Sequence, residues 1–180
     1  MRVITGSARG IPLKAPEGLQ TRPTADRVKE ALFSIIQFEI SGAKVLDLFG
    51  GSGQLGIEAL SRGAKSAVFV DAGESACKII KENLKQCKLE SQSTVIKCDY
   101  MEFLKRNRAQ YNIIFLDPPY AEVFLENALK CITEIDILQS NGIIVAERPV
   151  GKELPGNYPG YTRSKDYKYG KTLLTIFRKA

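Results

Sequence analysis

The fold is decided by Lys44-Val45-Leu46-Asp47-Leu48-Phe49-Gly50-Gly51-Ser52-Gly53, residues 44–53 of the chain. This stretch begins as an apolar run, which indicates a buried strand, and passes through a glycine-rich turn into a helix expected over residues 54–61. Glycine tolerates positive φ angles and lets a ligand approach the backbone closely. The stretch therefore predicts a strand–turn–helix unit with a ligand site where the strand ends.

The same alternation continues to about residue 147. Further strands are expected at residues 67–70, 94–97, 111–116 and 142–147, and further helices at residues 74–87, 100–106 and 121–133. Strands that are apolar at consecutive positions are typical of parallel strands buried on both faces. The predicted fold class is therefore α/β, a doubly wound Rossmann-like sheet that is mostly parallel and has right-handed crossovers.

Both ends of the chain depart from this alternation. Residues 161–168 and 172–177 indicate two extended segments joined by Tyr169-Gly170-Lys171, so a C-terminal antiparallel hairpin should close one edge of the sheet. Residues 1–23 indicate a small β-hairpin-like N-terminal extension, and we expect the whole chain, 1–180, to form a single domain. Thr24 is expected to cap the helix that follows. The apolar positions of that helix share one face: Val28, Ala31, Leu32 and Ile35.

The composition is that of a soluble globular protein. The 180 residues are 44% hydrophobic and 26% charged, and no apolar run approaches the ~18 residues of a membrane span. The start of the chain lacks a signal-peptide pattern, so we expect a cytoplasmic protein. We also expect the protein to act as a monomer. The chain has no histidine, which excludes Ser-His and Cys-His nucleophile pairs and His-ligated metal sites, and no metal is expected. The four cysteines lack C-x-x-C spacing and are expected to be buried thiols: Cys77, Cys87, Cys98 and Cys131.

The net charge of +6 is concentrated at the two ends of the chain. Residues 1–30 hold six Lys or Arg against three Asp or Glu, and residues 148–180 hold eight against two. The stretch between them is slightly acidic, with twelve against fifteen. Clustered cations release counterions from a phosphate backbone, so a polyanion is one interpretation and ordinary solvated surface is the other.

The glycine turn suits a nucleotide-like cofactor. Gly51, Gly53 and Gly56 have the G-x-G-x-x-G spacing of a dinucleotide-binding turn, so a nicotinamide oxidoreductase stays an alternative. Asp47, before the glycines, would face a pyrophosphate unfavourably and would attract an ammonium group. A cofactor with a positively charged amino-acid portion therefore fits better.

Two further acids follow strands. Asp71 lies 24 residues beyond Asp47, and an acid about 20 residues past such glycines accepts hydrogen bonds from ribose hydroxyls. Asp99 would accept a hydrogen bond from an adenine amine, with Tyr100 or Ala72 against the ring. For each acid the alternative is a cap on the helix that follows.

The tetrad Asp117-Pro118-Pro119-Tyr120 follows the fourth strand. The prolines fix the backbone, so the Asp117 carboxylate and the Pro118 carbonyl form a rigid, convergent pair of acceptors. An exocyclic amine has two N–H groups to donate to them, and a carboxylate already in place meets the charge that develops on nitrogen during attack. Tyr120 would stack on a base flipped out of its helix. The alternative is a Pro-Pro turn with a buried tyrosine.

Together these motifs are similar to those of class I S-adenosylmethionine-dependent methyltransferases, because residues 47–53, Asp71, Asp99 and 117–120 follow successive strands in that order. The segment at residues 21–33 closely resembles one typical of the bacterial 16S ribosomal RNA guanine-N2-methyltransferase family: Thr21-Arg22-Pro23-Thr24-Ala25-Asp26-Arg27-Val28-Lys29-Glu30-Ala31-Leu32-Phe33. The resemblance covers essentially the full chain and includes Arg9-Gly10, residues 60–64 and Tyr169-Gly170.

This resemblance implies methyl transfer from S-adenosylmethionine to the N2 amine of one guanine in 16S ribosomal RNA, free or within the assembled small subunit. The amine site would be lined by Asp117, Pro118, Pro119 and Tyr120. The cofactor would be held by Asp47, Phe49, Gly50, Gly51, Ser52, Gly53, Asp71, Ala72, Asp99 and Tyr100. Phosphates would be contacted by Arg9, Arg22, Lys165, Lys168 and Lys171. The chain departs from the family pattern at Gly51, where alanine is usual, and at Asp71-Ala72-Gly73, where a glutamate followed closely by another acid is common.

Besides the nicotinamide oxidoreductase, two further functions are compatible with the motifs. An adenine-N6 methyltransferase acting on DNA or RNA would use the same tetrad, although a chain of 180 residues lacks room for a separate DNA-recognition domain. A ribosome assembly factor with an inactive cofactor fold is the other, and the intact acids weigh against it.

Overall fold

The computed structural model describes residues 1–16, 26–119, 122–154 and 158–180. The predicted cap Thr24, the phosphate-contact candidate Arg22 and the tetrad residue Tyr120 lie outside these described residues. The division of the chain into one domain with an extension at residues 1–23 stays a prediction.

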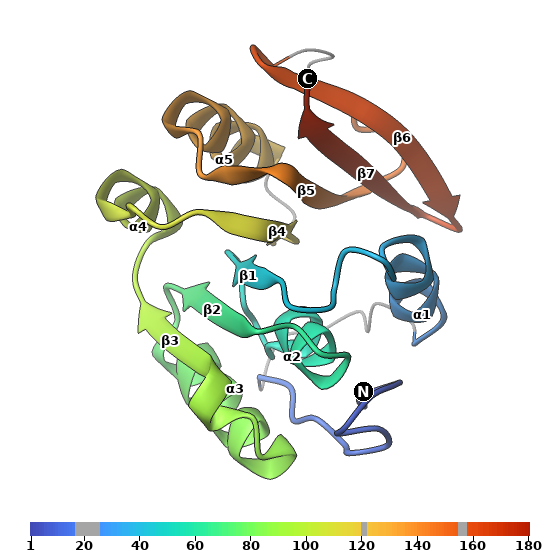
Figure 1. Cartoon of the computed structure of the whole chain (residues 1–180), viewed down its shortest axis with the longest axis vertical. Coiled ribbons are helices and arrows are strands. Elements are labelled where there is room, and N and C mark those ends of the chain that lie inside the picture. The colour runs from blue at the N-terminus through green and yellow to red at the C-terminus, as the bar shows by residue number, and fades with distance from the viewer. Residues whose placement is uncertain (17–25, 120–121, 155–157) are drawn as a thin grey trace.

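Within the described residues, a seven-stranded sheet has the strand order β3-β2-β1-β4-β5-β7-β6 (Figure 1). The strands are β1 (Lys44–Asp47), β2 (Ser66–Asp71), β3 (Ser93–Lys97), β4 (Tyr111–Leu116), β5 (Leu138–Pro149), β6 (Tyr161–Tyr169) and β7 (Thr172–Lys179). The first five pair in parallel, whereas β7 pairs antiparallel with both β5 and β6. The predicted α/β class, parallel sheet and C-terminal antiparallel hairpin are thus confirmed.

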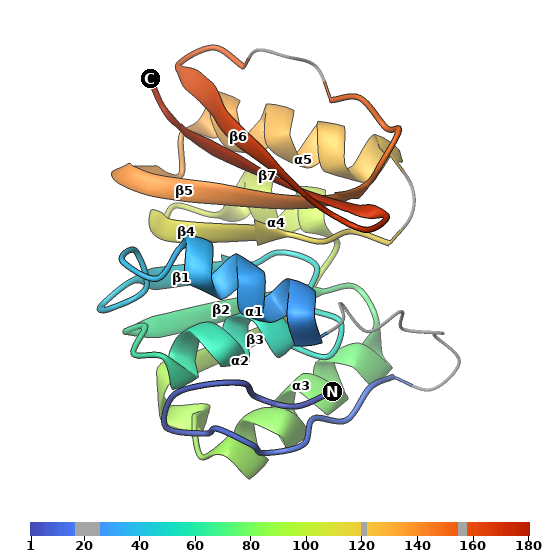
Figure 2. The same ribbon diagram turned by 90° about the vertical axis from the view of Figure 1, so that its right-hand side faces the viewer.

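The helices cover both faces of the sheet. They are α1 (Asp26–Ile35), α2 (Gln54–Ser61), α3 (Glu74–Cys87), α4 (Tyr100–Arg106) and α5 (Glu122–Ile135), with a short 3₁₀ turn at Glu90–Gln92. Neighbouring residues of one strand pack on opposite faces: Val45 joins the core formed with α1, α2 and α3, and Leu46 joins the core formed with α4 and α5. Figure 2 shows α1 and α2 in front of the strands and α5 behind them. This double coverage explains why the central strands are apolar at consecutive positions.

The predicted apolar face of α1 packs on the core, and the helix also buries two residues that were not predicted, Lys29 and Phe33. Its buried residues are Lys29, Leu32 and Phe33, whereas Val28 and Ile35 stay half-buried. The Lys29 ammonium is fully buried and lies 3.6 Å from the Glu58 carboxylate of α2. Burial lowers the pKa of Lys29, and the Glu58 charge opposes that effect. An ion pair between helices therefore adds to the apolar contacts of Val28, Leu32 and Ile35 with the core.

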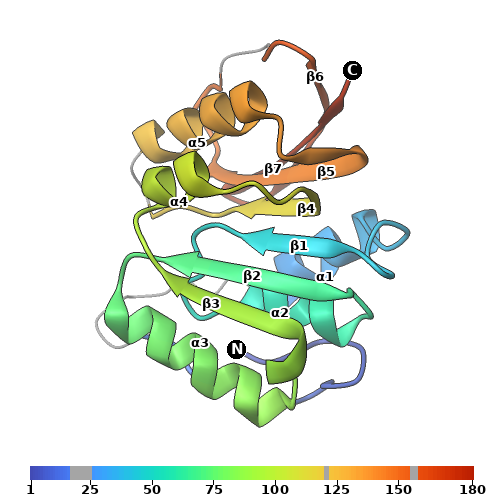
Figure 3. The same cartoon turned by 60° about the vertical axis from the view of Figure 1, so that its left-hand side comes forward.

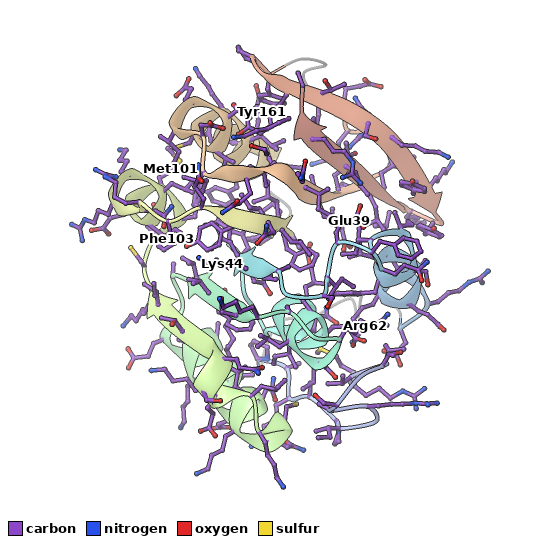
Figure 4. The ribbon with its side chains drawn as sticks, in the orientation of Figure 1. Glu39, Lys44, Arg62, Met101, Phe103 and Tyr161 are labelled. Atoms are coloured by element: carbon purple, nitrogen blue, oxygen red, sulfur yellow. The ribbon has the colours of Figure 1, made fainter. Side chains whose placement is uncertain are left out.

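Glu58 also attaches the N-terminal segment to the fold. Its carboxylate accepts hydrogen bonds from the Ile4 N–H at 2.8 Å, the Thr5 N–H at 3.0 Å and the Arg62 Nε at 2.8 Å. Arg62, labelled in Figure 4, has its guanidinium 4.9 Å from the centre of the Phe33 ring on α1. One buried carboxylate thus connects α1, α2 and the start of the chain.

Asn83 makes a second connection between the N-terminal segment and the glycine turn. The Asn83 side chain, fully buried on α3, donates to the Lys14 and Ser52 carbonyls at 3.0 and 2.9 Å and accepts from the Lys14 N–H at 2.8 Å. The N-terminal segment is therefore held beside the turn that follows β1.

Among the residues that the structure describes, no helix is long and apolar enough to cross a membrane.

Candidate active site

The carboxyl ends of the parallel strands border a cavity of about 750 Å³, a size typical of small-molecule sites. Figure 3 shows these strands ending on the same side of the sheet. One acid from each of the five parallel strands, at or just after its carboxyl end, lines the cavity: in sheet order, Asp99, Asp71, Asp47, Asp117 and Glu147. The cavity is therefore strongly acidic along its floor, which favours a cationic ligand.

The glycine turn forms one wall of the cavity. The Gly50 N–H donates to the Val70 carbonyl of β2 at 2.8 Å, and Gly51 and Gly53 have φ angles of 56° and 78°. A Cβ at Gly50 would lie 2.8 Å from the Ile80 Cδ1 of α3. The turn therefore needs glycine for its backbone conformation at Gly51 and Gly53, and Gly50 packs closely against Ile80.

Asp47 lies at the base of this turn and is 2% exposed. Its Oδ2 accepts a hydrogen bond from the Gly56 N–H at 3.0 Å, in the first turn of α2. Burial raises the pKa of Asp47 to about 7, the Gly56 bond opposes this, and the charges of Asp117 and Asp71 add to it. Asp47 is thus a carboxylate whose ionised form needs a cation nearby.

Asp71 is half-buried and holds the glycine turn to the start of α3. Its Oδ2 accepts from the Gly51 N–H at 2.9 Å, and its Oδ1 accepts from the Gly73 N–H at 2.8 Å. Each oxygen keeps a further lone pair, and Asp71 lines the cavity together with Ala72. The predicted ribose contact stays a prediction.

Asp99 is the N-cap of α4, which was the alternative role considered for it. Its Oδ1 accepts from the backbone N–H groups of Met101 and Glu102 at 2.9 and 3.2 Å. Both capping bonds are made by Oδ1. Asp99 also lines the cavity, so its second carboxylate oxygen belongs to a residue at the edge of the site. The neighbouring Cys98, expected to be buried, is half-exposed and lines the cavity, because β3 is an edge strand.

Three aromatic rings stand together at this end of the cavity. The Tyr100 ring lies 5.1 Å from Phe49 and meets Phe124 edge-on at 5.6 Å. All three line the cavity, and Phe124, in the first turn of α5, is 37% exposed. Phe124 was not predicted, since an aromatic residue in an amphipathic helix is usually part of the core.

Asp117 and Pro118, directly after β4, line the same cavity as the glycine turn. Both are half-buried, and Pro119 is exposed. Burial raises the pKa of Asp117 to about 6, so the carboxyl is mostly ionised at neutral pH. The structure thus brings three residues of the predicted tetrad to the cavity, and the fourth, Tyr120, lies outside the described residues.

The side of the cavity formed by β5 and β7 was largely missed by the sequence prediction. Glu147, Arg148 and Lys171 line it, and only Lys171 had been singled out. The buried Arg148 guanidinium donates to Thr175 Oγ1 at 3.1 Å and to Asp166 Oδ2 at 2.9 Å, which ties the end of β5 to β7 and β6. Adjacent acidic and basic residues near the end of a strand carry no local signal, because only the sheet order places them here.

The other basic candidates among the described residues do not line the cavity. Lys165 and Lys168 are exposed on β6, and the Lys165 ammonium lies 5.1 Å from the Tyr167 ring. Arg9 is exposed near the end of α2, where the preceding Ala8 N–H donates to Ser61 Oγ at 2.9 Å. Any contact of these three side chains with a polyanion would therefore be made outside the cavity.

Comparison with known proteins gives these features a family. A family model described as "Conserved hypothetical protein 95" matches residues 1–178. The chain belongs to this family. The sequence of this chain is 42% identical to "Putative rRNA methyltransferase YlbH" of Bacillus subtilis over 99% of both chains. It is 31% identical to "Ribosomal RNA small subunit methyltransferase D" of Escherichia coli, over 99% of this chain and 90% of the relative.

The solved structures agree with this assignment. The "Putative methyltransferase yhhF from Escherichia coli" superposes with a TM-score of 0.90 at 30% identity, over 99% of this chain and 97% of that one. The predicted membership of the class I methyltransferases, and with it the predicted cofactor S-adenosylmethionine, is confirmed. The described residues fit that cofactor: a buried acid beneath a glycine turn suits its cationic amino-acid portion, and the aromatic rings beside Asp99 suit its adenine.

Proposed function

We propose that this methyltransferase modifies the exocyclic N2 amine of a guanine in 16S ribosomal RNA, free or within the assembled small ribosomal subunit. The observation that carries the proposal is that Asp117 and Pro118 share one cavity with the glycine turn. An amine bound by Asp117 and Pro118 would therefore share this cavity with the cofactor. The relatives whose names specify the small subunit support this substrate class.

The roles of the residues follow from their chemistry. When bound, S-adenosylmethionine supplies an electrophilic methyl group on a sulfonium. The Asp117 carboxylate and the Pro118 carbonyl accept the two N–H groups of the amine, which directs the nitrogen lone pair away from the ring. The ionised Asp117 meets the positive charge that develops on nitrogen and is placed to take up the proton that is lost. Catalysis rests on alignment and electrostatics.

The distribution of charge around the cavity is consistent with an RNA substrate. The floor beside the glycine turn is acidic, whereas Lys171 stands on the β7 side and Lys165 and Lys168 extend along β6. We propose that these lysines contact phosphates next to the target base, and that Arg9 and Arg22 contact more distant ones. Removal of phosphate contacts should weaken binding uniformly and reduce its dependence on salt.

The direct test is transfer of a labelled methyl group to small ribosomal subunits from a strain that lacks this protein. The RNA is then digested to nucleosides and the modified position is mapped. We expect label in N2-methylguanosine at one position of 16S RNA. Label in N6-methyladenosine would support the adenine alternative instead, and an absence of label from free RNA and subunits alike would contradict the proposal.

A further inference from the structure

Glu147 stands beside the tetrad on the side of the cavity away from the cofactor turn. The strands β1, β4 and β5 are consecutive in the sheet, so Asp117 lies between Asp47 and Glu147. Leu116 and Ala146 are register partners, and Asp117 and Glu147 are the residues that follow them on adjacent parallel strands. Adjacent strands are about 4.8 Å apart, so the two residues are neighbours across the sheet, and both line the cavity.

The other acids of the cavity have structural roles on the cofactor side. Asp47 accepts from the start of α2, Asp71 holds the glycine turn, and Asp99 caps α4. Glu147 differs in position, since its other neighbour in the sheet is the buried, apolar Leu174 of β7. It is therefore the acid that a base held at Asp117 would meet on its far side.

Two neighbouring carboxylates disfavour each other's ionised form unless hydrogen-bond donors lie between them. The edge of guanine that carries the N2 amine offers such donors, because the amine is next to the N1–H. The corresponding edge of adenine has its N6 amine next to an unprotonated N1, which is an acceptor. A carboxylate therefore attracts the guanine edge and repels the adenine edge.

We propose that Glu147 accepts a hydrogen bond from the N1–H of the target base, and that this contact selects guanine over adenine. This inference rests on the proposed function, because it assigns a specificity residue to the same site. Arg148, the next residue, supports this role by fixing the end of β5 through Asp166 and Thr175. Asp117 engages the amine and Glu147 identifies the ring that carries it.

The test uses a base that keeps the amine and lacks the N1–H. 2-Aminopurine has the same 2-amine as guanine, but its N1 is an acceptor. The mapped target nucleotide is replaced by 2-aminopurine riboside in a ligated RNA, supplied free or in reconstituted subunits, whichever form the wild-type enzyme methylates. The kcat/KM is measured for both bases with the wild type, with Glu147→Gln and with the control Glu153→Gln, which changes an exposed glutamate that does not line the cavity.

We expect the wild type and the control to prefer guanine over 2-aminopurine roughly 10- to 100-fold, because the unprotonated N1 of 2-aminopurine would face the Glu147 carboxylate with one acceptor against another. Glu147→Gln should reduce that preference to within about threefold, because a glutamine amide donates to an unprotonated N1 as readily as it accepts from N1–H. Melting temperature and cofactor affinity of the variant should match the wild type. Any difference in intrinsic reactivity between the two bases is common to all three proteins and cancels in the comparison.

Either of two results would overturn the inference: equal wild-type activity on both bases, or a preference that Glu147→Gln leaves unchanged. A variant that loses activity on both bases equally gives the second result, since the ratio is then the same. Failure of the proposed function is recognised separately, because the wild type would then form no N2-methylguanosine on the unmodified RNA, and the assignment of Glu147 would fall with it.

Discussion

Substitution of Asp47 by asparagine should affect stability and cofactor binding in opposite directions. Asp47 is 2% exposed, and burial raises its pKa from 3.8 to about 7. Between those two pH values the unfolded chain has lost this proton and the folded protein keeps it. The contribution of Asp47 to the free energy of unfolding therefore falls as pH rises from about 4 to about 7, and it is constant above that range.

The size of the effect follows from the same values. A tenfold change in acidity corresponds to about 1.36 kcal/mol, so the difference between 3.8 and about 7 corresponds to about 4 kcal/mol. Asparagine removes the charge and keeps an oxygen for the Gly56 N–H. Without cofactor at pH 8, Asp47→Asn should therefore be more stable than the wild type by up to about 4 kcal/mol, or about 8–16 °C in melting temperature.

Cofactor binding should weaken in the same variant. A hydrogen bond to a charged group contributes about 1.5–3 kcal/mol, so loss of the Asp47 charge should raise the Kd for S-adenosylmethionine roughly 10- to 150-fold. Thermal denaturation at pH 5 and pH 8 and isothermal titration calorimetry at pH 8 measure the two effects. Glu90→Gln, which removes an exposed carboxylate from the 3₁₀ turn, is the control and should change neither quantity.

Two results would refute this reasoning. The first concerns the difference in stability between ligand-free Asp47→Asn and the wild type. If this difference were no larger at pH 8 than at pH 5, burial would not destabilise the ionised Asp47 carboxylate. If the variant bound the cofactor as tightly as the wild type, Asp47 would not face its cationic portion.

Two further predictions concern the framework of the site. Glu58→Ala should lower the free energy of unfolding by about 3–5 kcal/mol, because it leaves the buried Lys29 ammonium without its counter-charge. Urea denaturation measures this loss, and adding Lys29→Met should recover part of it. A loss below about 1 kcal/mol would contradict the role of the ion pair. Gly56→Ala should cost about 1–3 kcal/mol, because its Cβ would lie 2.3 Å from the Phe69 ring. Phe69→Leu should cost less in the Gly56→Ala background than alone, and strictly additive losses would show that the two positions do not clash.

The sequence was sufficient to predict the fold because strong periodic signals coincide with strong punctuation. The helix predicted over residues 74–87 and the strand predicted over 111–116 have the bounds found for α3 and β4. The strand predicted over residues 142–147 is longer in the structure, running from Leu138 to Pro149, because β7 and β4 supply partners on both sides. Such partners are distant in the chain, so a local pattern does not contain them.

The site was predictable where its residues follow strands in a recognisable order, and it was missed where only tertiary structure assembles it. Asp47 and Asp117 reach one cavity because both are at carboxyl ends of adjacent parallel strands. Glu147 reaches the same cavity by the same rule, but it lies inside β5, which runs two residues beyond it to Pro149, so no turn signal directly follows it. Lys29 was missed for another reason, since a buried lysine is predicted only when its counter-charge on another helix is known.

The central claim is that the Asp117 carboxylate accepts a hydrogen bond from the amine that receives the methyl group. The variant Asp117→Ala tests this claim most directly. Cofactor Kd and single-turnover methyl transfer are measured on the substrate that the wild type modifies, together with the pH dependence of wild-type kcat/KM. We expect an unchanged Kd, a loss of roughly 100- to 1000-fold in the transfer rate, and a wild-type kcat/KM that falls as pH drops below about 6, where Asp117 is protonated. A variant that transfers methyl groups at the wild-type rate would contradict the account.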